Sequence, residues 1–237
     1  MSETRVPTIL VVDDEVALRD AIAFDFKRKG FQVLVAASGS EAFKIIQTRE
    51  VDVVLSDVRM PGGDGMELLK NIKSLNPETP VVMFITGFAD MTLEEAYDEG
   101  AVAVFSKPFD RKELHSTVQK SVTPRDQRWC KCPEKLATTQ NVELHLPEPR
   151  FGSGGMFISM QENFPIAGAP LEFAIRFEHH PPGSVEGSGI VRWVRKHFAA
   201  DRPPGCGVEF CFLSESCRKP IIERLKNLKT KSFIPRS

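Results

Sequence analysis

Four strand-like runs in the first half of the chain are each followed by residues that can do phosphoryl chemistry. Carboxylates that lie close together repel one another unless a cation sits among them, and Mg²⁺ prefers oxygen ligands. A carboxylate acceptor beside a metal ion, a hydroxyl and an ammonium suits phosphoryl transfer, and Asp57 is the natural acceptor. In chain order the residues are Asp13 and Asp14 after TILVV, Asp57 after DVVLS, Thr86 after VVMFI and Lys107 after VAVFS.

The elements that must position these residues alternate between two kinds. Short β-branched runs predict five strands, and amphipathic stretches between them predict helices, which together indicate a parallel, doubly wound α/β sheet. Sites in such sheets lie at the carboxyl ends of the strands, so we expect the candidate residues to meet at one edge. The last helix begins at a plausible capping box, Asp110 with Glu113. The expected strands are TILVV, FQVLV, DVVLS, VVMFI and VAVFS, and the expected helices run through 18–26, 42–46, 66–72, 90–99 and 114–118.

Residues 1–122 resemble a response-regulator receiver domain of the CheY-like kind over their full length. The motifs that carry the resemblance are VVDDE, SDVRMPGGDG, FITG and FSKPF, in the family's order. The resemblance implies that Asp57 is phosphorylated by a histidine kinase or a phosphotransfer protein, and that Lys107–Pro108 is a cis peptide. It also implies that Thr86 and Lys107 contact the phosphoryl group. The implied Mg²⁺ ligands are Asp13, Asp14, Asp57 and the backbone carbonyl of Arg59.

Two departures from related patterns refine this interpretation. Phosphatases of the haloacid-dehalogenase type carry their nucleophile in a spaced Asp-x-Asp after the first strand, whereas here the first acidic pair is adjacent, so we reject that class. Receivers usually have an aromatic residue three positions before the lysine, and here Val104 occupies that position. Phe105 should point to the opposite side of the sheet. We expect phosphorylation to be retained and leave the usual aromatic switch open.

The pattern of the second half of the chain predicts a domain built mainly of β-strands. Leu171, Phe173, Ile175 and Phe177 alternate with polar or small residues, which indicates a strand with one buried face. A helix is expected around 221–228. We therefore predict a linker or arm at 123–140 and, at 141–237, a small antiparallel β-barrel with a C-terminal helix. The expected strands are GMFISM, PLEFAIRFE, GIVRWVRKH and GCGVEFCFL.

The order SGGMFI, IVRWV, GCGVEF and a final helix resembles the PilZ domain over about residues 125–229. Members that bind cyclic-di-GMP carry an Arg-x-x-x-Arg arm and an Asp/Asn-x-Ser-x-x-Gly turn. Here the last glycine of the turn is present, but arginine and glycine replace its two polar residues, and the arm's arginines are three positions apart with Trp129 in the place of the second. The residues left for an anionic ligand such as cyclic-di-GMP are Arg125, Arg128, Arg150 and Gly155.

The stretch RFGSGGMF at residues 150–157 has two interpretations. Glycines allow backbone amides to approach a phosphate, and they also allow positive φ in a tight turn. Two missing polar positions would leave groups of a bound base unpaired at about 1–3 kcal/mol each. We therefore expect RFGSGGMF to keep the turn and to have lost nucleotide recognition.

Composition narrows the class of protein. The 237 residues carry a net charge of −1, divided into −6 over residues 1–122 and +5 over the remainder. No apolar run approaches the roughly 20 residues of a membrane span, and a cytoplasmic location is the default. The five cysteines are expected to be reduced thiols. No helix-turn-helix pattern follows residue 122, so DNA binding is not expected.

The sequence thus predicts a two-component response regulator in which phosphorylation of Asp57 controls a divergent PilZ-like output domain that binds a partner protein. The alternative is an effector that also binds cyclic-di-GMP, and the two differ by Arg125, Arg128 and Arg150. An enzymatic second half ranks last because it shows no cluster of catalytic residues. The kinase, the downstream partner, and whether the chain forms a homodimer stay open at this stage.

Overall fold

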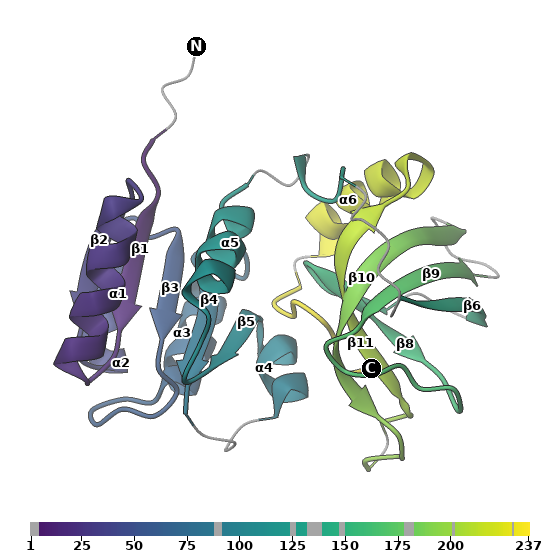
Figure 1. Cartoon of the computed structure of the whole chain (residues 1–237), viewed down its shortest axis with the longest axis horizontal. Coiled ribbons are helices and arrows are strands. Elements are labelled where there is room, and N and C mark those ends of the chain that lie inside the picture. Colours follow the sequence, from purple (N-terminus) through teal and green to yellow (C-terminus); the bar gives the residue numbers. More distant parts are fainter. Residues whose placement is uncertain are drawn as a thin grey trace. The chain divides into compact units, whose positions relative to one another are not determined.

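The chain divides into two compact units, residues 1–91 with 99–123 and residues 92–98 with 124–237. Each unit is described by itself, and Figure 1 labels the elements along the chain. The computed structural model describes residues 5–87, 92–123, 127–131, 139–146, 150–177, 183–200, 202–228 and 230–237.

The first unit contains a parallel sheet with the strand order β2-β1-β3-β4-β5. This confirms the predicted five-stranded α/β fold. The strands are β1 (Thr8–Val12), β2 (Gln32–Ala36), β3 (Val53–Ser56), β4 (Val81–Thr86) and β5 (Ala101–Ser106). The helices are α1 (Val16–Arg28), α2 (Gly39–Thr48), α3 (Gly65–Leu75) and α5 (Arg111–Ser121), and α4 (Leu93–Glu99) precedes β5 in the chain.

Burial and capping explain why these segments form these elements. Every residue of β1 and of β3 is buried, as expected for central strands covered by helices on both faces. Helix α5 begins where the Asp110 carboxylate accepts hydrogen bonds from the backbone N–H groups of Lys112 (2.6 Å) and Glu113 (3.2 Å). The cap satisfies donors that the helix itself leaves open. Helix α5 therefore starts close after Lys107 and helps fix the end of β5.

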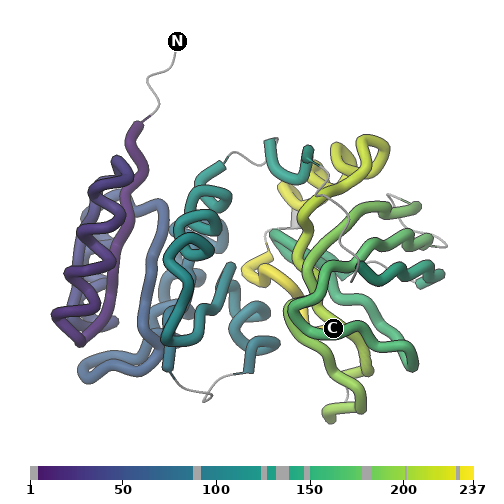
Figure 2. The backbone as a smooth tube through the Cα atoms, in the orientation of Figure 1, coloured from purple at the N-terminus to yellow at the C-terminus, as the bar shows by residue number. Residues whose placement is uncertain are grey.

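The second unit is built on a six-stranded sheet with the order β6-β9-β10-β11-β8-β7. Figure 2 follows its backbone in green through the strands and then into the yellow segment after the last helix. The strands are β6 (Gln140–Leu146), β7 (Arg150–Phe151), β8 (Gly155–Ser159), β9 (Pro170–Phe177), β10 (Ser184–Arg195) and β11 (Gly205–Leu213), followed by helix α6 (Glu215–Leu228).

This sheet corrects the prediction of a small antiparallel barrel. Strands β8 to β11 pair antiparallel, but β6 pairs parallel with β9, so the sheet is mixed. A parallel neighbour requires a long crossover, and β7 and β8 lie between β6 and β9 in the chain. Within the described residues β6 and β7 are the two edges, so the sheet forms a half-barrel. Sequence reasoning missed β6 and β7 because one is half polar and the other has two residues.

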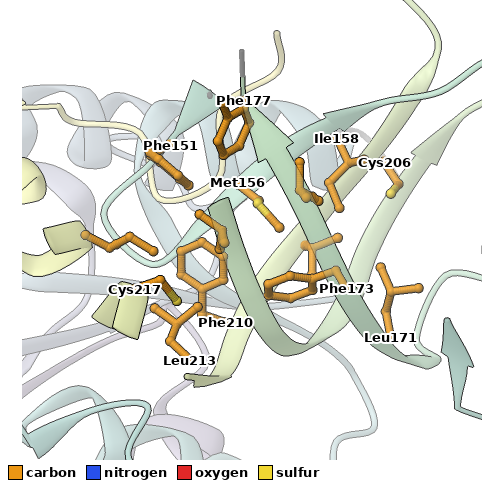
Figure 3. Packing of buried hydrophobic residues seen from close by; sticks show 14 of the residues in the cluster. Phe151, Met156, Ile158, Leu171, Phe173, Phe177, Cys206, Phe210, Leu213 and Cys217 are labelled. Carbon is orange, nitrogen blue, oxygen red and sulfur yellow. The ribbon is translucent and has the colours of Figure 1, made fainter. Parts of the chain in front are cut away.

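The predicted buried face of β9 is confirmed. Leu171, Phe173, Ile175 and Phe177 are all buried and enter one core with residues of β8, β11 and α6. Figure 3 shows Phe173 and Phe210 among these side chains, with Met156 between strands and Cys217 of α6 beside Leu213. The core thus fixes the strands that carry the turn at residues 152–155. None of the helices in the described parts of the chain is long and apolar enough to cross a membrane.

Candidate functional site

Three carboxylates meet at the carboxyl ends of β1 and β3. Asp13, Asp14 and Asp57 each offer an oxygen, and these oxygens lie within 4.8 Å of one another. Asp13 is buried and Asp14 is exposed, so the group lies at the rim of the unit with one member open to solvent. The parallel order places β1 directly beside β3, which is why residues 44 positions apart in the chain come together here. The sheet produces the convergence that the spacing of the motifs predicts.

Lys107 lies among these carboxylates. Its Nζ donates to Asp57 Oδ2 at 2.6 Å and to Asp13 Oδ2 at 3.0 Å. Partial burial of Lys107 opposes its charge, but the hydrogen bonds and Coulomb attraction from Asp57 and Asp13 outweigh that cost and raise the pKa of the ammonium above its ordinary value. The lysine therefore stays charged at neutral pH and offsets the repulsion between the carboxylates.

The backbone around Asp57 holds its other carboxylate oxygen. Oδ1 accepts hydrogen bonds from the N–H groups of Val58 (2.6 Å) and Arg59 (3.4 Å). Gly65, the first residue of α3, donates its N–H to the carbonyl of Val58 at 2.7 Å. A Cβ at Gly65 would overlap the carbonyl oxygen of Asp57, so only glycine lets α3 approach this closely. The same contacts bring the backbone of Arg59, a predicted metal ligand, next to Asp57.

Thr86 and Lys107 come from the ends of neighbouring strands. Thr86 ends β4 and is buried, and the N–H of Lys107 donates to its carbonyl at 2.8 Å. The Lys107–Pro108 peptide is cis, as expected. The structure thus brings Asp13, Asp14, Asp57, Arg59, Thr86 and Lys107 to one edge of the sheet.

The aromatic position before the lysine differs from the usual receiver pattern in structure as well as in sequence. Val104 is half-buried and pairs in register with Phe84 of β4. Phe105 is buried in the hydrophobic core of the unit with Ile85 and Leu114, and successive strand residues point to opposite faces. Phe105 therefore does not replace the missing aromatic side chain at position 104, as the alternation predicts.

The donor set fits a hard divalent cation. All three clustered side chains supply carboxylate oxygens, which is the ligand type that Mg²⁺ prefers. The exposure of Asp14 leaves an approach for the waters that Mg²⁺ commonly retains. The residues that would hold the ion are Asp13, Asp14 and Asp57, with the backbone of Arg59 beside them.

The glycine-rich stretch of the second unit is the corner between β7 and β8. The N–H of Gly152 donates to the carbonyl of Gly155 at 2.9 Å, which closes the turn. The next two N–H groups point to a different segment: Ser153 donates to the carbonyl of Ser232 (2.8 Å) and Gly154 to the carbonyl of Phe233 (3.1 Å). The turn is therefore a docking surface for the backbone after α6.

The reason for glycine at these positions is close approach. Gly152, Gly154 and Gly155 do not have positive φ, so the expected reason, conformational freedom in a tight turn, does not apply. A Cβ at Gly152 would overlap the backbone of Phe233, a Cβ at Gly154 would overlap the Phe233 ring, and a Cβ at Gly155 would overlap the carbonyl oxygen of Val208. The stretch is a hairpin corner, as expected, but its glycines are needed for close packing and not for positive φ.

The four candidate nucleotide-binding residues have separate places in the second unit. Arg125 lies outside the described residues. Arg128 precedes Trp129, whose ring packs edge-on against Phe210. Arg150 begins β7 and pairs in register with Phe157; Gly155 begins β8 and pairs with Glu209. Trp129, in the place of the second arm arginine, thus packs against the hydrophobic core.

Sequence reasoning missed the segment at 232–236, which carries several of the unit's polar contacts. Phe233 donates its N–H to the carbonyl of Tyr97 at 2.9 Å. Arg236 donates its backbone N–H and its Nε to Asp98 at 3.1 and 2.7 Å. Arg195 donates to the carbonyl of Arg236 at 2.6 Å. The run KSFIPRS has no periodicity to mark it, and only its Phe-Ile pair signals burial.

Comparison with known proteins places the first unit. A family profile described as the response regulator receiver domain matches residues 9–119. Sporulation initiation phosphotransferase F of Bacillus subtilis is 34% identical over 113 residues, which cover 47% of this chain and 90% of that protein. Regulatory protein AtoC of Escherichia coli is 38% identical over 120 residues, which cover 50% of this chain and 26% of that protein.

One of the similar solved structures is also a receiver domain. The signal receiver domain of an HD domain-containing protein from Pseudomonas fluorescens is 28% identical, with a TM-score of 0.48, and the match covers 52% of this chain and 90% of that one. The assignment rests on the profile match to residues 9–119 and on the 34% identity over 90% of the Bacillus protein. Through residues 9–119 the chain belongs to the response-regulator receiver family.

Proposed function

We propose that this chain is a phosphorylation-controlled response regulator whose acceptor is Asp57 and whose second unit acts by binding a protein. The observation that carries the proposal is the cluster of Asp13, Asp14 and Asp57, with oxygens within 4.8 Å and Lys107 Nζ at 2.6 Å from the acceptor. The Bacillus relative is named as a phosphotransferase, which supports phosphoryl chemistry. The donor would be a histidine kinase or a phosphotransfer protein.

The chemistry follows from the side chains. A carboxylate oxygen of Asp57 attacks the phosphorus of a phosphohistidine; the new P–O bond forms as the P–N bond breaks, and the imidazole leaves with the electron pair. Lys107 keeps a positive charge beside the transferred group, and Thr86 supplies a hydroxyl at the neighbouring strand end. When bound, Mg²⁺ supplies further positive charge against the phosphoryl oxygens. Later hydrolysis of the acyl phosphate resets the site, and we propose no separate catalytic domain.

The second unit is proposed to be a divergent PilZ-like output domain. Support comes from the order of its strands and its final helix, with the glycine corner at 152–155 next to β8. Its mixed half-barrel differs from the expected barrel. The resemblance therefore supports only the class of domain, and its ligand has to be inferred from the residues of the candidate site. We assign the output of this unit to contact with a partner protein.

Cyclic-di-GMP binding is the alternative, and the contacts of the turn argue against it. The N–H groups of Ser153 and Gly154 already donate to Ser232 and Phe233. The two polar side chains that would read the base are replaced by Arg150 and Gly152. A bound nucleotide would have to displace the segment and would still lack partners for its polar groups, at about 1–3 kcal/mol for each unpaired group.

The experiment that tests the proposal is phosphorylation of the full chain with acetyl phosphate and Mg²⁺, followed by mass spectrometry of its peptides. We expect one phosphorylated site, Asp57. The same reaction without Mg²⁺, with EDTA present, should be strongly reduced. A phosphoryl group found on another residue, or equal labelling with and without the metal, would contradict the assignment.

A further inference from the structure

The second unit contains a slot at the turn Gly152–Gly155, which holds a segment of backbone from after α6. We call its occupant, Ser232–Ile234, the strap. Two consecutive carbonyls of the strap accept hydrogen bonds from two consecutive N–H groups of the turn, at 2.8 and 3.1 Å. The strap is bent at Phe233 and Ile234, and the turn holds this bent backbone through contacts that use no side chain of the strap.

Specificity comes from two side chains of the strap. The ring of Phe233 lies where a Cβ of Gly154 would be, and Ile234 Cγ1 lies 2.9 Å from where a Cβ of Gly155 would be. Both strap residues are buried, with exposed fractions of 7% and 0%. The ring of Phe233 also stacks with Tyr97, with 6.1 Å between centroids. An aromatic residue followed by an aliphatic one therefore fills the slot.

The strap is joined to α6 by a short linker. The helix ends at Leu228, and three residues separate it from Ser232. The other edge of the strap pairs with Tyr97, whose carbonyl accepts the N–H groups of Phe233 (2.9 Å) and Ile234 (3.4 Å). The strap is thus held between the turn and Tyr97, and Ser232 and the following Arg236 also donate to the carboxylate of Asp98.

We propose that this slot is the partner site of the second unit, that its ligand class is a short peptide that bends at a Phe-aliphatic pair, and that the strap is the resident occupant with which a partner's peptide competes. The proposal deepens the proposed output by protein contact and rests on it for the identity of the partner as a protein. A ligand tethered by a short linker acts at an effective concentration of about a millimolar. The wild-type chain should therefore bind such a peptide weakly.

The test uses the full chain and a fluorescent peptide, TKSFIPRS, which copies residues 230–237. Phe233→Ala removes the strap's anchor and leaves the slot intact. We expect this variant to bind the peptide at least about tenfold tighter than wild type by fluorescence anisotropy, since the tethered competitor is weakened. The matched control is Phe198→Ala, because Phe198 is exposed and lies in the same unit; it should bind like wild type.

Two further arms decide specificity. Phe233→Ala should not gain affinity for TKSAIPRS, and adding Gly154→Ala to Phe233→Ala should abolish binding of TKSFIPRS, because the new methyl group fills the slot. A folded Phe233→Ala chain that binds no better than Phe198→Ala, or that binds both peptides equally, would overturn the proposal. If Phe233→Ala does not fold, Phe233→Leu keeps most of the apolar volume and carries the same comparison.

Cyclic-di-GMP is titrated into the same Phe233→Ala chain by calorimetry. Binding of the nucleotide without binding of the peptide would assign the slot to nucleotide and overturn the peptide class. These titrations contain no phosphoryl donor, so a failure of Asp57 to be phosphorylated does not alter them. A failure of the slot and a failure of the proposed response-regulator function are therefore distinguishable.

Discussion

The carboxylate cluster of the first unit and the glycine turn of the second are both polar sites at strand ends, but they differ in whether their groups already have partners. At the cluster, Asp14 is exposed and the Lys107 ammonium lies between the carboxylates of Asp13 and Asp57. At the turn, the N–H groups of Ser153 and Gly154 are bound to the strap. A motif can therefore mark the position of a site while only the contacts reveal whether it is open to a ligand.

The largest effect that tests this comparison is expected at the acceptor. Asp57→Asn replaces the nucleophilic carboxylate by an amide, so phosphorylation by acetyl phosphate with Mg²⁺ should be abolished, as measured by mass spectrometry. Asp64→Asn is the matched control: Asp64 caps α3 through the N–H of Met66, and asparagine caps nearly as well. Phosphoryl labelling that survives in Asp57→Asn would show that Asp57 is not the acceptor and that the cluster is not the phosphorylation site.

The next effect concerns the cation. Lys107→Ala removes the donor to both Asp57 and Asp13, and loss of one stabilising donor in a preorganised site costs about 10²–10³-fold in rate. We expect the rate of phosphorylation by acetyl phosphate to fall by roughly that factor, with Asp57 still the modified residue. A rate within a factor of two of wild type would show that Lys107 serves only to hold the unphosphorylated cluster together.

A second lysine of the first unit, Lys73, shows the opposite pKa shift to that of Lys107. Lys73 is buried and donates to the carbonyl of Pro80 at 2.9 Å; burial lowers its pKa to about 8. Between that value and its ordinary pKa of 10.5, the unfolded chain binds the extra proton, so stability rises with pH across this window. The contribution is up to about 3 kcal/mol, because one pKa unit corresponds to about 1.4 kcal/mol.

Urea unfolding at pH 7.5, 9 and 10 measures this contribution as the difference between wild type and Lys73→Met. The wild-type chain should gain free energy of unfolding relative to the variant as the pH rises. An exposed lysine, changed in Lys70→Met, is the control and should give a flat difference. A flat difference for Lys73→Met as well would mean that burial does not depress the pKa of this lysine.

The smallest effect is expected at the turn. Gly154→Ala places a methyl group against the Phe233 ring, and overpacking of this kind costs about 1–3 kcal/mol. We expect a lower free energy of unfolding and faster hydrogen exchange at Ser153, with the phosphorylation rate of Asp57 unchanged. Ser153→Ala adds no atoms and keeps the N–H, so it should leave both properties unchanged. An unaltered exchange rate at Ser153 in Gly154→Ala would show that the strap does not depend on this contact.

The sequence by itself determined the first unit and its candidate site. Five β-branched runs separated by amphipathic stretches admit few arrangements other than a parallel sheet, and such a sheet brings Asp13, Asp57 and Lys107 to one edge whatever the details of packing. The side chain alternation of β9 and of Val104 with Phe105 was also predictable, because it depends only on the period of a strand.

Tertiary structure decided the rest. The parallel pairing of β6 with β9 depends on which edge a polar strand reaches, and local pattern does not encode that choice. The reason for Gly152 and Gly154 is a segment about 80 residues later in the chain, so it cannot be seen in RFGSGGMF. Whether a turn's N–H groups are available to a ligand depends on contacts between distant residues, whereas which residues can do chemistry depends on their own side chains.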